Sequence, residues 1–592
     1  MLGVCGTTCV HLLLRLGTRA GAASAAQLSL VLGLLVFWVA LRLLPRRPVR
    51  APAAFAEQLA LVAAALFTWR AFGWLVFTDP TALRVLSPNN LGDLSLHLSL
   101  IRYLSTDVPF WPESPILARA PLRYPIGADL FNAILLAAGL DAVRGLVLTG
   151  FVGAIAVFGA LWRWARGFGI AAFLFAGGLA GFEILAGHGF RDYQDGVAWK
   201  SLPLASLVTQ RGLLYAIPAG LLLLDSWRAR LRGGNRKPLP FWAEWILLGT
   251  LPLFHAHSLL CLGALLAGCM AFGAGPVRAH AMKLALASLP PAVALTHLIT
   301  GGFSTGGTVA FHPGWMQGDA YVFWFWLLNF GVVPFLLAIL AARLVRRDPA
   351  AREARCFVLP ALGLIALAVF FRLAPWEWDN VKVFLWAYLA VLPALYALVL
   401  QPLPLRFRVP VLAPLFFSGA VSLVGGLGPQ HRGNEIAPRA ELDAAALALG
   451  SLPPHSRIAA AQDYNHPVLL NGWPVAAGYA GHLWSHGYPN HKTVEENLRT
   501  LLSGAEGWEE AARRLGTPYL CWSRKEASAY PDSRKPWENR LRIAAEAPGF
   551  RFYDLTPVLD PSDRPLAAAA QPAAAIAQPI RSERSADPPE TF

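Results

Sequence analysis

The chain has 592 residues, of which 55% are apolar and only 15% are charged. Soluble globular proteins carry about 25% charged residues, so this composition excludes a water-soluble enzyme, and its apolar runs exclude disorder over most of the length. We expect a polytopic α-helical membrane protein. The net charge of +14 indicates arginine-rich cytoplasmic loops rather than a nucleic-acid surface.

Apolar segments that recur along the chain predict about 12 membrane spans. They cover residues 28–44, 55–77, 145–162, 168–187, 211–227, 240–254, 257–273, 281–299, 321–342, 356–373, 380–400 and 409–426. The stretch 125–140 is also apolar, but it is short and opens with Pro and Gly. We expect it to form a juxtamembrane or re-entrant helix, because an additional span would disturb the charge pattern of the loops.

Basic residues then fall on one side of the membrane, which the positive-inside rule makes the cytoplasm. The clusters are Arg42/Arg46/Arg47/Arg50, Arg163/Arg166, Arg228/Arg230/Arg232/Arg236/Lys237, Arg278/Lys283, Arg343/Arg346/Arg347/Arg352/Arg355 and Arg406/Arg408. Every loop between these clusters is expected to face outward, as are both ends of the chain.

Composition divides the chain into four parts. We expect an N-terminal segment (1–54) with one extra span and a transmembrane domain (55–427) with an outward loop at 78–144. Residues 428–562 alternate short apolar runs with amphipathic stretches, which predicts a small outward α/β domain. Residues 563–592 are rich in Ala and Pro and predict a disordered tail. The six Cys form no CxxC pair and no disulfide framework.

Within the α/β domain, specific elements are predicted from the spacing of apolar residues. Strands are expected at 457–461, 467–472, 519–523 and 550–555, and helices at 493–504 and 508–516.

Polar residues gather in the predicted outward loops, and ionisable groups near a bilayer are functional candidates by default. In the first loop, Asp93 and His97 are spaced to share one face of a helix, although Asp93 could instead cap that helix. Glu113 lies between two prolines, which hold it rigidly. It is a second carboxylate that could converge with Asp93, or a solvated loop acid. Arg123 and Tyr124 follow.

The second outward loop carries Asp192 and Asp195 and ends at Arg211, which opens the next span. A cation at a helix N-terminus opposes the helix dipole. Arg211 therefore resembles a clamp for an anion, with a snorkelling interfacial arginine as the alternative.

His255 and His257 lie at a predicted outward turn in an apolar context. This HxH spacing can bind a metal on an extended backbone, and a pair of hydrogen-bonded turn histidines is the alternative.

A further group of candidates surrounds the entry to the span at 380–400. Arg372 closes the preceding span, and Trp376 is a candidate interfacial anchor. Asp379 and Lys382 enter the next helix. Lys382 could neutralise a ligand phosphate or simply pair with a neighbouring carboxylate.

In the α/β domain, residues 479–491 contain three histidines and three aromatic residues. His482 and His486 are candidates for binding a sugar or for docking the domain onto the membrane part. A packed aromatic turn is the alternative.

The order of these features resembles the GT-C superfamily of integral membrane glycosyltransferases. The segment GDLSLHLSLIRYL…FWPESPILARAPLRYPIGADLF looks like the first outward loop of bacterial members. LVTQRGLLYAIPAGLLLL, LPLFHAHS and WEWDNVKVFLW resemble blocks of related membrane proteins, and GYAGHLWSHG resembles a glycine–aromatic turn of their outward domain. The resemblance covers roughly residues 55–555. Many members carry two close acidic residues in the first loop, whereas here Asp93 is followed by Ser95 and His97 and has no neighbouring acid.

The resemblance implies a GT-C-like fold in the bacterial cytoplasmic membrane, with the active site and the C-terminal domain facing outward. It implies transfer of a sugar from a polyprenyl-phosphate-linked donor to a glycan, lipid or protein acceptor. A divalent cation, Mg²⁺ or Mn²⁺, could assist, but we assign no residues to a metal.

The chemistry of such a transfer suggests roles for the candidates. A phosphate leaving group needs cations to hold its developing charge, and the donor-phosphate candidates are Arg123, Arg211, Arg372 and Lys382. The acceptor hydroxyl needs one general base. Asp93 is the first candidate, with His97 orienting it or sharing its proton and with Glu113 as the second carboxylate. One base and one direct displacement would invert the anomeric centre. The substrate-binding candidates are Tyr124, Asp192, Asp195, His255, His257, Trp376, Asp379, His482 and His486.

Three other functions share some of these features. A transporter or flippase for a lipid-linked sugar would also need spans and a basic clamp, although such proteins often show repeated halves and no repeat is visible here. A non-catalytic assembly protein for envelope glycans could retain the fold. A metal-dependent hydrolase could be built on His255 and His257.

Overall fold

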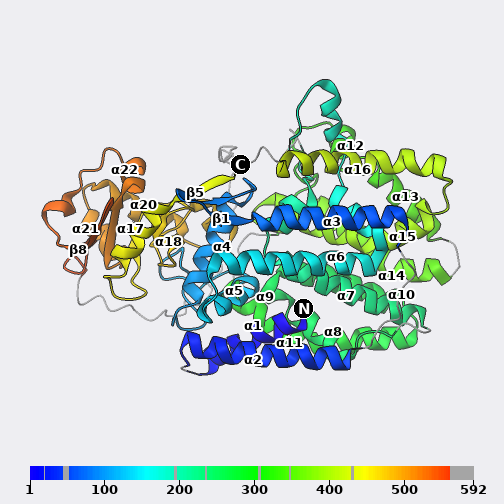
Figure 1. The fold of residues 1–592 in the computed structure, drawn as a ribbon, viewed down its shortest axis with the longest axis horizontal. Helices are drawn as coiled ribbons and strands as arrows, with labels where there is room; N and C mark the ends of the chain where they lie inside the picture. Colours follow the sequence, from blue (N-terminus) through cyan, green and yellow to red (C-terminus); the bar gives the residue numbers. More distant parts are fainter. Residues whose placement is uncertain are drawn as a thin grey trace, which may run out of the picture.

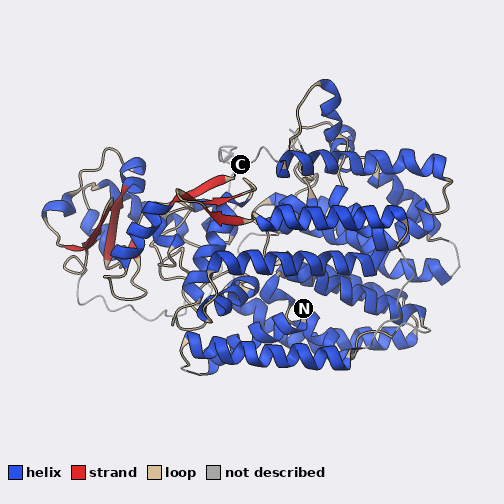
Figure 2. Cartoon of the chain, in the orientation of Figure 1, coloured by secondary structure: helices blue, strands red, loops and turns tan. Residues whose placement is uncertain are grey.

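The computed structural model describes residues 1–18, 20–44, 53–191, 197–233, 237–303, 309–345, 349–428 and 433–559. Long helices lie side by side through most of the molecule, and a smaller region with a β-sheet lies beyond one end of them (Figures 1 and 2). Helices α4 and α5 lie between these two parts (Figure 1).

The helices of the larger part follow one another along most of the chain. They are α1 (Leu2–Gly17), α2 (Ala22–Leu43), α3 (Phe55–Gly73), α4 (Asn90–Leu104), α5 (Gly127–Ala137), α6 (Ala142–Phe175), η1 (Ala180–Ala186), η2 (Pro203–Val208), α7 (Leu213–Arg232), α8 (Phe241–Gly249), α9 (Leu251–Phe254), α10 (Ala256–Phe272), α11 (Gly275–Thr300), α12 (Val322–Phe330), α13 (Val333–Arg343), α14 (Pro349–Phe370), η3 (Glu377–Asn380), α15 (Val381–Leu395), η4 (Tyr396–Leu400) and α16 (Leu405–Leu427).

Seven helical segments in the described residues are long and apolar enough to cross a membrane, or eight if the pair α12 and α13, bent by 87°, forms one span. The chain is therefore a multi-pass helical membrane protein. The sequence predicts about 12 spans. Part of the difference arises where the structure builds an expected span from shorter helices, as in Phe241–Phe254 and Ala256–Phe272.

The chain reverses its direction within the bounds of α6. Ala165 and Arg166 have non-helical backbone angles, and the rings of Phe158 and Phe173 lie 6.2 Å apart. In a continuous helix, residues 15 positions apart would be separated by about 22 Å. The chain therefore turns back at the Arg163/Arg166 pair, where the sequence predicts a loop between two spans.

The first loop is held between the helices and the smaller region. Helix α5 has 11 residues, or about 16 Å of helix, which is about half the thickness of a bilayer core. Strands β1 (Val76–Thr78) and β2 (Ala82–Val85) of this loop pair with β5 (Asn434–Pro438) in a three-stranded antiparallel sheet. This pairing attaches the C-terminal region to the loop that carries Asp93.

A second short sheet joins two connections of the larger part. It consists of β3 (Ala310–Phe311) and β4 (Phe371–Arg372), which are antiparallel.

The C-terminal region is a small α/β structure around a four-stranded sheet in the order β6–β7–β9–β8 (Figure 2). Only the β6–β7 pair is parallel. The strands are β6 (Ile458–Ala459), β7 (Tyr519–Ser523), β8 (Ile543–Ala547) and β9 (Phe550–Asp554), and the helices are α17 (Arg439–Leu449), α18 (Pro467–Leu470), α19 (Ala480–Ser485), α20 (His491–Ser503), α21 (Trp508–Leu515), α22 (Arg524–Ala529) and η5 (Pro536–Asn539).

Most predicted elements of this region are confirmed. Strands form within 457–461, 519–523 and 550–555, and helices α20 and α21 cover the two predicted helices. The strand predicted at 467–472 is wrong, because Pro467–Leu470 forms a helical turn. Pro467 is at its first position, and the His466 ring accepts a hydrogen bond from the Val468 N–H, both of which favour a helix start.

Candidate functional site

Charged and aromatic side chains from distant parts of the sequence meet where the long helices end, next to the C-terminal region. Asp93 on α4 interacts electrostatically with His97, Lys382, Asp379 and Arg211. We call the whole group the polar cluster; its members are Asp93, His97, Tyr124, Asp129, Arg211, His255, His257, Asp379, Lys382, His482 and His486.

Close backbone packing brings these segments together. A Cβ at Gly212 would lie 2.1 Å from the Phe254 carbonyl oxygen, and one at Gly127 would lie 2.8 Å from the Leu253 carbonyl oxygen. Both positions therefore need glycine. The start of α7, the start of α5 and the break between α9 and α10 consequently meet at one place, which positions Arg211 and His255.

Asp93 is the exposed carboxylate of the polar cluster. It lies in the first turn of α4, whose N-cap is Asn89, so Asp93 is not the cap of that helix. Its side chain is open to solvent, yet the surrounding protein desolvates it and raises its pKa, while His97, Lys382 and Arg211 act in the opposite direction. An accessible carboxylate with a raised pKa can both touch a ligand and hold a proton.

Behind Asp93, one turn along α4, His97 is buried against a second carboxylate. Its Nδ1 lies 2.8 Å from Oδ1 of Asp129, and the two side chains are 4% and 1% exposed. Asp129 lies in the first turn of α5. In the sequence, the one signal for Asp129 is that an acidic residue stands at a helix start.

Arg211 is buried within the polar cluster without full hydrogen bonding. It is 2% exposed, and its Nε and Nη1 have no hydrogen-bond partner among the described residues. Nη2 donates a long bond of 3.4 Å to the Leu207 carbonyl. Leaving buried donors of a charged group unpaired is costly, so the N–H groups on these two nitrogens can donate to an anionic ligand.

Lys382 is the second cation of the polar cluster. Its Nζ lies 2.9 Å from Oδ1 of Asp379, and it also interacts electrostatically with Asp93 and His486. The pairing of Lys382 with a neighbouring carboxylate is therefore confirmed, while its binding of a ligand phosphate stays a prediction.

His255 and His257 lie where α9 and α10 meet. The ring of His255 caps α10, with Nδ1 2.8 Å from Ser258 Oγ, while its Nε2 has no partner among the described residues. The two rings are 5.8 Å apart. Because Nδ1 of His255 is bonded to Ser258, His255 matches the alternative of a hydrogen-bonded turn histidine.

The C-terminal region contributes two imidazoles. His486 lies against the ring of Tyr124 at 4.8 Å, and His482 lies 6.1 Å from His486. Burial, together with neighbouring positive charge, lowers the pKa of His482 to about 4 and that of His486 to about 3. Both rings are therefore neutral at pH 7 and can contact a ligand as polar, flat surfaces.

Two predicted site residues lie elsewhere and tie the first loop to the C-terminal region. Glu113 is 63% exposed and pairs with Arg457 at 3.0 Å, so it is not the second carboxylate beside Asp93. Arg123 donates to the Gly487 carbonyl at 2.7 Å and lies over the ring of Tyr488.

Other predicted residues are also placed outside the polar cluster or cannot be described. Trp376 is 45% exposed and packs on Trp378. Arg372 is in strand β4. Asp192 and Asp195 lie outside the described residues.

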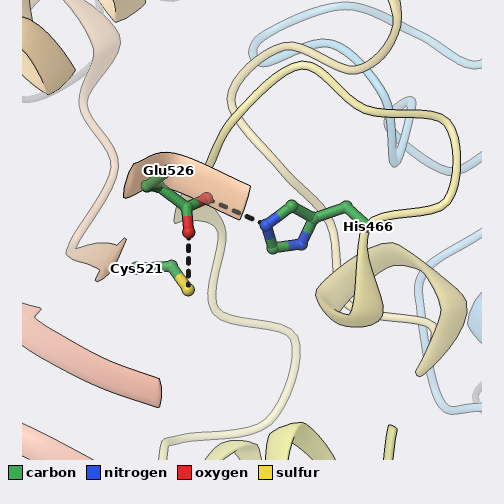
Figure 3. Close-up of side chains that lie close together, drawn as sticks. All are labelled: His466, Cys521 and Glu526. Carbon is green, nitrogen blue, oxygen red and sulfur yellow. Dashed lines mark hydrogen bonds and ion pairs between the residues drawn. The ribbon is translucent and has the colours of Figure 1, made fainter. Parts of the chain in front are cut away.

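A separate buried group in the C-terminal region has the residue types of a metal site (Figure 3). His466, Cys521 and Glu526 offer ligand atoms within 4.8 Å of one another. Both Glu526 oxygens already accept hydrogen bonds: Oε1 from Ala461 N–H and His466 Nε2, and Oε2 from Ser523. Because every acceptor is occupied, this group is explained as a structural hydrogen-bond network.

Comparisons with known proteins give structural neighbours only. No protein-family model matches the chain, and no curated protein sequence matches it. It is structurally similar to ArnT from Cupriavidus metallidurans, crystallised bound to undecaprenyl phosphate (TM-score 0.44, 14% identity) and in the apo state (0.43, 12%), over 86% of this chain and 100% of ArnT in both cases.

The chain is also similar to the Archaeoglobus fulgidus oligosaccharyltransferase tethered with an acceptor peptide containing the NVT sequon. The TM-score is 0.45 at 13% identity, over 82% of this chain and 72% of that one. With TM-scores below 0.5, these neighbours assign no activity or residue roles, and the function proposed below rests on the polar cluster itself.

Proposed function

We propose that the chain is an inverting membrane glycosyltransferase that moves a sugar from a polyprenyl-phosphate-linked donor to an acceptor at the outer membrane surface. Asp93 acts as the general base, and Arg211 and Lys382 hold the donor phosphate. The observation that carries the proposal is the convergence of one accessible carboxylate and two cations from three distant segments.

Asp93 fits the role of general base because its carboxylate is accessible and its pKa is raised. An acceptor hydroxyl becomes a nucleophile only as it loses its proton, and a carboxylate with a raised pKa takes that proton more readily. Asp93 has both properties. The other carboxylates of the polar cluster are paired, Asp379 with Lys382 and Asp129 with His97, which leaves Asp93 as the single candidate base and favours direct displacement and inversion.

The cations fit a phosphate leaving group. Charge-assisted hydrogen bonds from a guanidinium to phosphate oxygens are strong, and guanidinium geometry suits two oxygens at once. Arg211 has two buried N–H-bearing nitrogens without a partner among the described residues. A departing phosphate stabilised in this way needs no strong general acid.

A lipid-linked donor fits the place of the polar cluster at the ends of membrane helices. Lys382 is in the first turn of α15, within a segment, Glu377–Leu400, that is long and apolar enough to span a bilayer. A donor with an isoprenoid tail can keep the tail in lipid while its phosphate reaches these cations. The outward direction of this end follows from the positive-inside argument.

The deciding experiment follows the chemical fate of the donor. Purified protein in vesicles made from bacterial membrane lipids should consume a sugar-linked polyprenyl phosphate and release free polyprenyl phosphate, detected by mass spectrometry. Movement of the intact sugar lipid between leaflets without cleavage would instead support the transporter. Neither cleavage nor movement would favour a non-catalytic assembly protein.

Binding tests the cations separately. Arg211→Gln should weaken retention of undecaprenyl phosphate by about 10- to 100-fold, the usual worth of a charged hydrogen-bond pair. Arg439→Gln is the matched control, because Arg439 is 56% exposed and pairs with the exposed Asp443 at the surface. Equal retention by Arg211→Gln and the control would contradict the assigned role of Arg211.

A further inference from the structure

Asp93 must lose the proton that it takes from each acceptor, and His97 of the buried pair His97–Asp129 lies one turn away on the same helix. We propose that Asp129 is a positioning residue that fixes the tautomer of His97, so that Nε2 of His97 receives the proton that Asp93 takes from the acceptor. This inference rests on the proposed function and states how Asp93 loses its proton after each transfer.

The first step concerns the proton on the imidazole. Nδ1 of His97 lies 2.8 Å from Oδ1 of Asp129. A carboxylate accepts hydrogen bonds, so the neutral imidazole carries its proton on Nδ1 and leaves the lone pair of Nε2 free. A carboxylate placed behind an imidazole in this way fixes its orientation and stabilises the imidazolium when it forms.

The second step concerns what surrounds the ring. Asp93 shares its helix face one turn away and interacts with it electrostatically. From other elements, Asp129 faces it from α5 and Tyr124 lies 5.9 Å from it, edge-on. His482 and His486 of the C-terminal region also interact with it. His97 therefore lies between one carboxylate that fixes it and another that is accessible to substrate.

A comparison among the imidazoles of the polar cluster singles out His97. His482 and His486 have pKa values lowered to about 4 and about 3, so they accept protons poorly at neutral pH. His255 is bonded to the hydroxyl of Ser258. Within the described part of the cluster, His97 is the imidazole paired with a carboxylate.

The proton and electron pairs balance in this sequence. The acceptor oxygen bonds to the anomeric carbon as its proton passes to Asp93, and the bond from that carbon to the phosphate oxygen breaks with the pair staying on phosphate. Asp93 then gives the proton to Nε2 of His97, and water removes it. Asp93 is again an anion, and no other reactant is needed.

Kinetics of Asp129→Asn test the positioning role. An amide can donate to Nδ1 and so drive the proton onto Nε2. We expect the rate of sugar-lipid cleavage to fall about 100-fold with little change in KM. The acidic limb of the pH–rate profile should move to lower pH, because the carboxylate that stabilises the imidazolium is gone.

Two further variants guard against a folding artefact. Asp129→Glu retains the carboxylate and should recover part of the lost rate. Asn132→Ser is the matched control: Asn132 is also buried on α5, but it bonds Thr149 and the Ala128 carbonyl. Its pH profile should remain that of the wild type. An Asp129→Asn enzyme with wild-type rate and profile would overturn the inference.

A spectroscopic readout needs no turnover. In protein labelled with ¹⁵N-histidine, the ring signals of His97, assigned by their loss in His97→Gln, should show Nδ1–H in the wild type and Nε2–H in Asp129→Asn. The Nε2–H form in the wild type would overturn the inference. A wild-type protein that shows the Nδ1–H form but cleaves no donor would instead overturn the proposed function.

Discussion

The molecule contains two buried pairs of histidine and carboxylate with the same separation but different surroundings. His97–Asp129 and His466–Glu526 both have a ring nitrogen 2.8 Å from a carboxylate oxygen. Around His466 and Glu526, each ring nitrogen and each carboxylate oxygen has a protein partner (Figure 3). Around His97 and Asp129, the second oxygen of Asp129 has no hydrogen-bond partner among the described residues.

This difference distinguishes a structural pair from a chemical one. A fully bonded network holds elements together, and any loss leaves buried groups unpaired. In the pair His97–Asp129, Oδ2 of Asp129 has no hydrogen-bond partner among the described residues. The pair lies next to the accessible carboxylate of Asp93 and the incompletely bonded Arg211, so it can exchange protons with a ligand. The comparison predicts that the two pairs respond differently to substitution. Changes at His466–Glu526 should lower the stability of the fold, and changes at His97–Asp129 should lower the rate of donor cleavage.

Removing the structural carboxylate should have the largest effect on stability. Glu526→Ala leaves His466, the Ala461 N–H and the Ser523 groups unpaired in the core. Breaking a buried pair typically costs about 3–5 kcal/mol. We expect a lower thermal midpoint and faster limited proteolysis of the C-terminal region. Stability like that of the wild type would show that the network is not structural.

Acid should act on the same network. Burial raises the pKa of Glu526, but His466 and the hydrogen bonds outweigh it and lower the pKa from 4.5 to about 2. A carboxyl group whose folded pKa is depressed stabilises the fold above its unfolded pKa. That contribution should therefore decline as pH falls from about 4.5 toward 2. Unfolding midpoints measured across this window should fall in the wild type and fall less steeply in Glu526→Gln.

A substitution at the surface ion pair should have the smallest effect. Glu113 is 63% exposed and pairs with Arg457, and such exposed pairs typically contribute about 0–1 kcal/mol. Glu113→Gln is expected to leave the rate of donor cleavage within about twofold of the wild type. A loss comparable to that of Asp129→Asn would return Glu113 to the role of second carboxylate.

Much of the fold follows from sequence pattern because burial in lipid and in the core imposes it. Hydropathy identifies the helices, and charge indicates which ends lie together. The turn between Phe158 and Phe173 is confirmed at the predicted arginines. Pattern fails where a local start signal decides the structure, as at Pro467, or where expected spans are built from shorter helices.

The candidate site was only partly accessible from sequence. The sequence identifies four candidates by their chemistry, and the structure brings them together although they are far apart in the chain: Asp93, Arg211, Lys382 and His486. Their meeting depends on tertiary contacts, such as the close approach of Gly212 to the Phe254 carbonyl. No spacing rule predicts that His97 turns toward Asp129, or that Glu113 turns away to Arg457.

The central claim is tested most directly by Asp93→Asn, with donor cleavage and undecaprenyl phosphate retention measured on the same preparation. Asp443→Asn, an exposed acid at the surface, is the control. The account predicts retention like that of the wild type with cleavage reduced about 10²- to 10⁴-fold, the usual contribution of a general base. Cleavage at the wild-type rate by folded Asp93→Asn protein would contradict it.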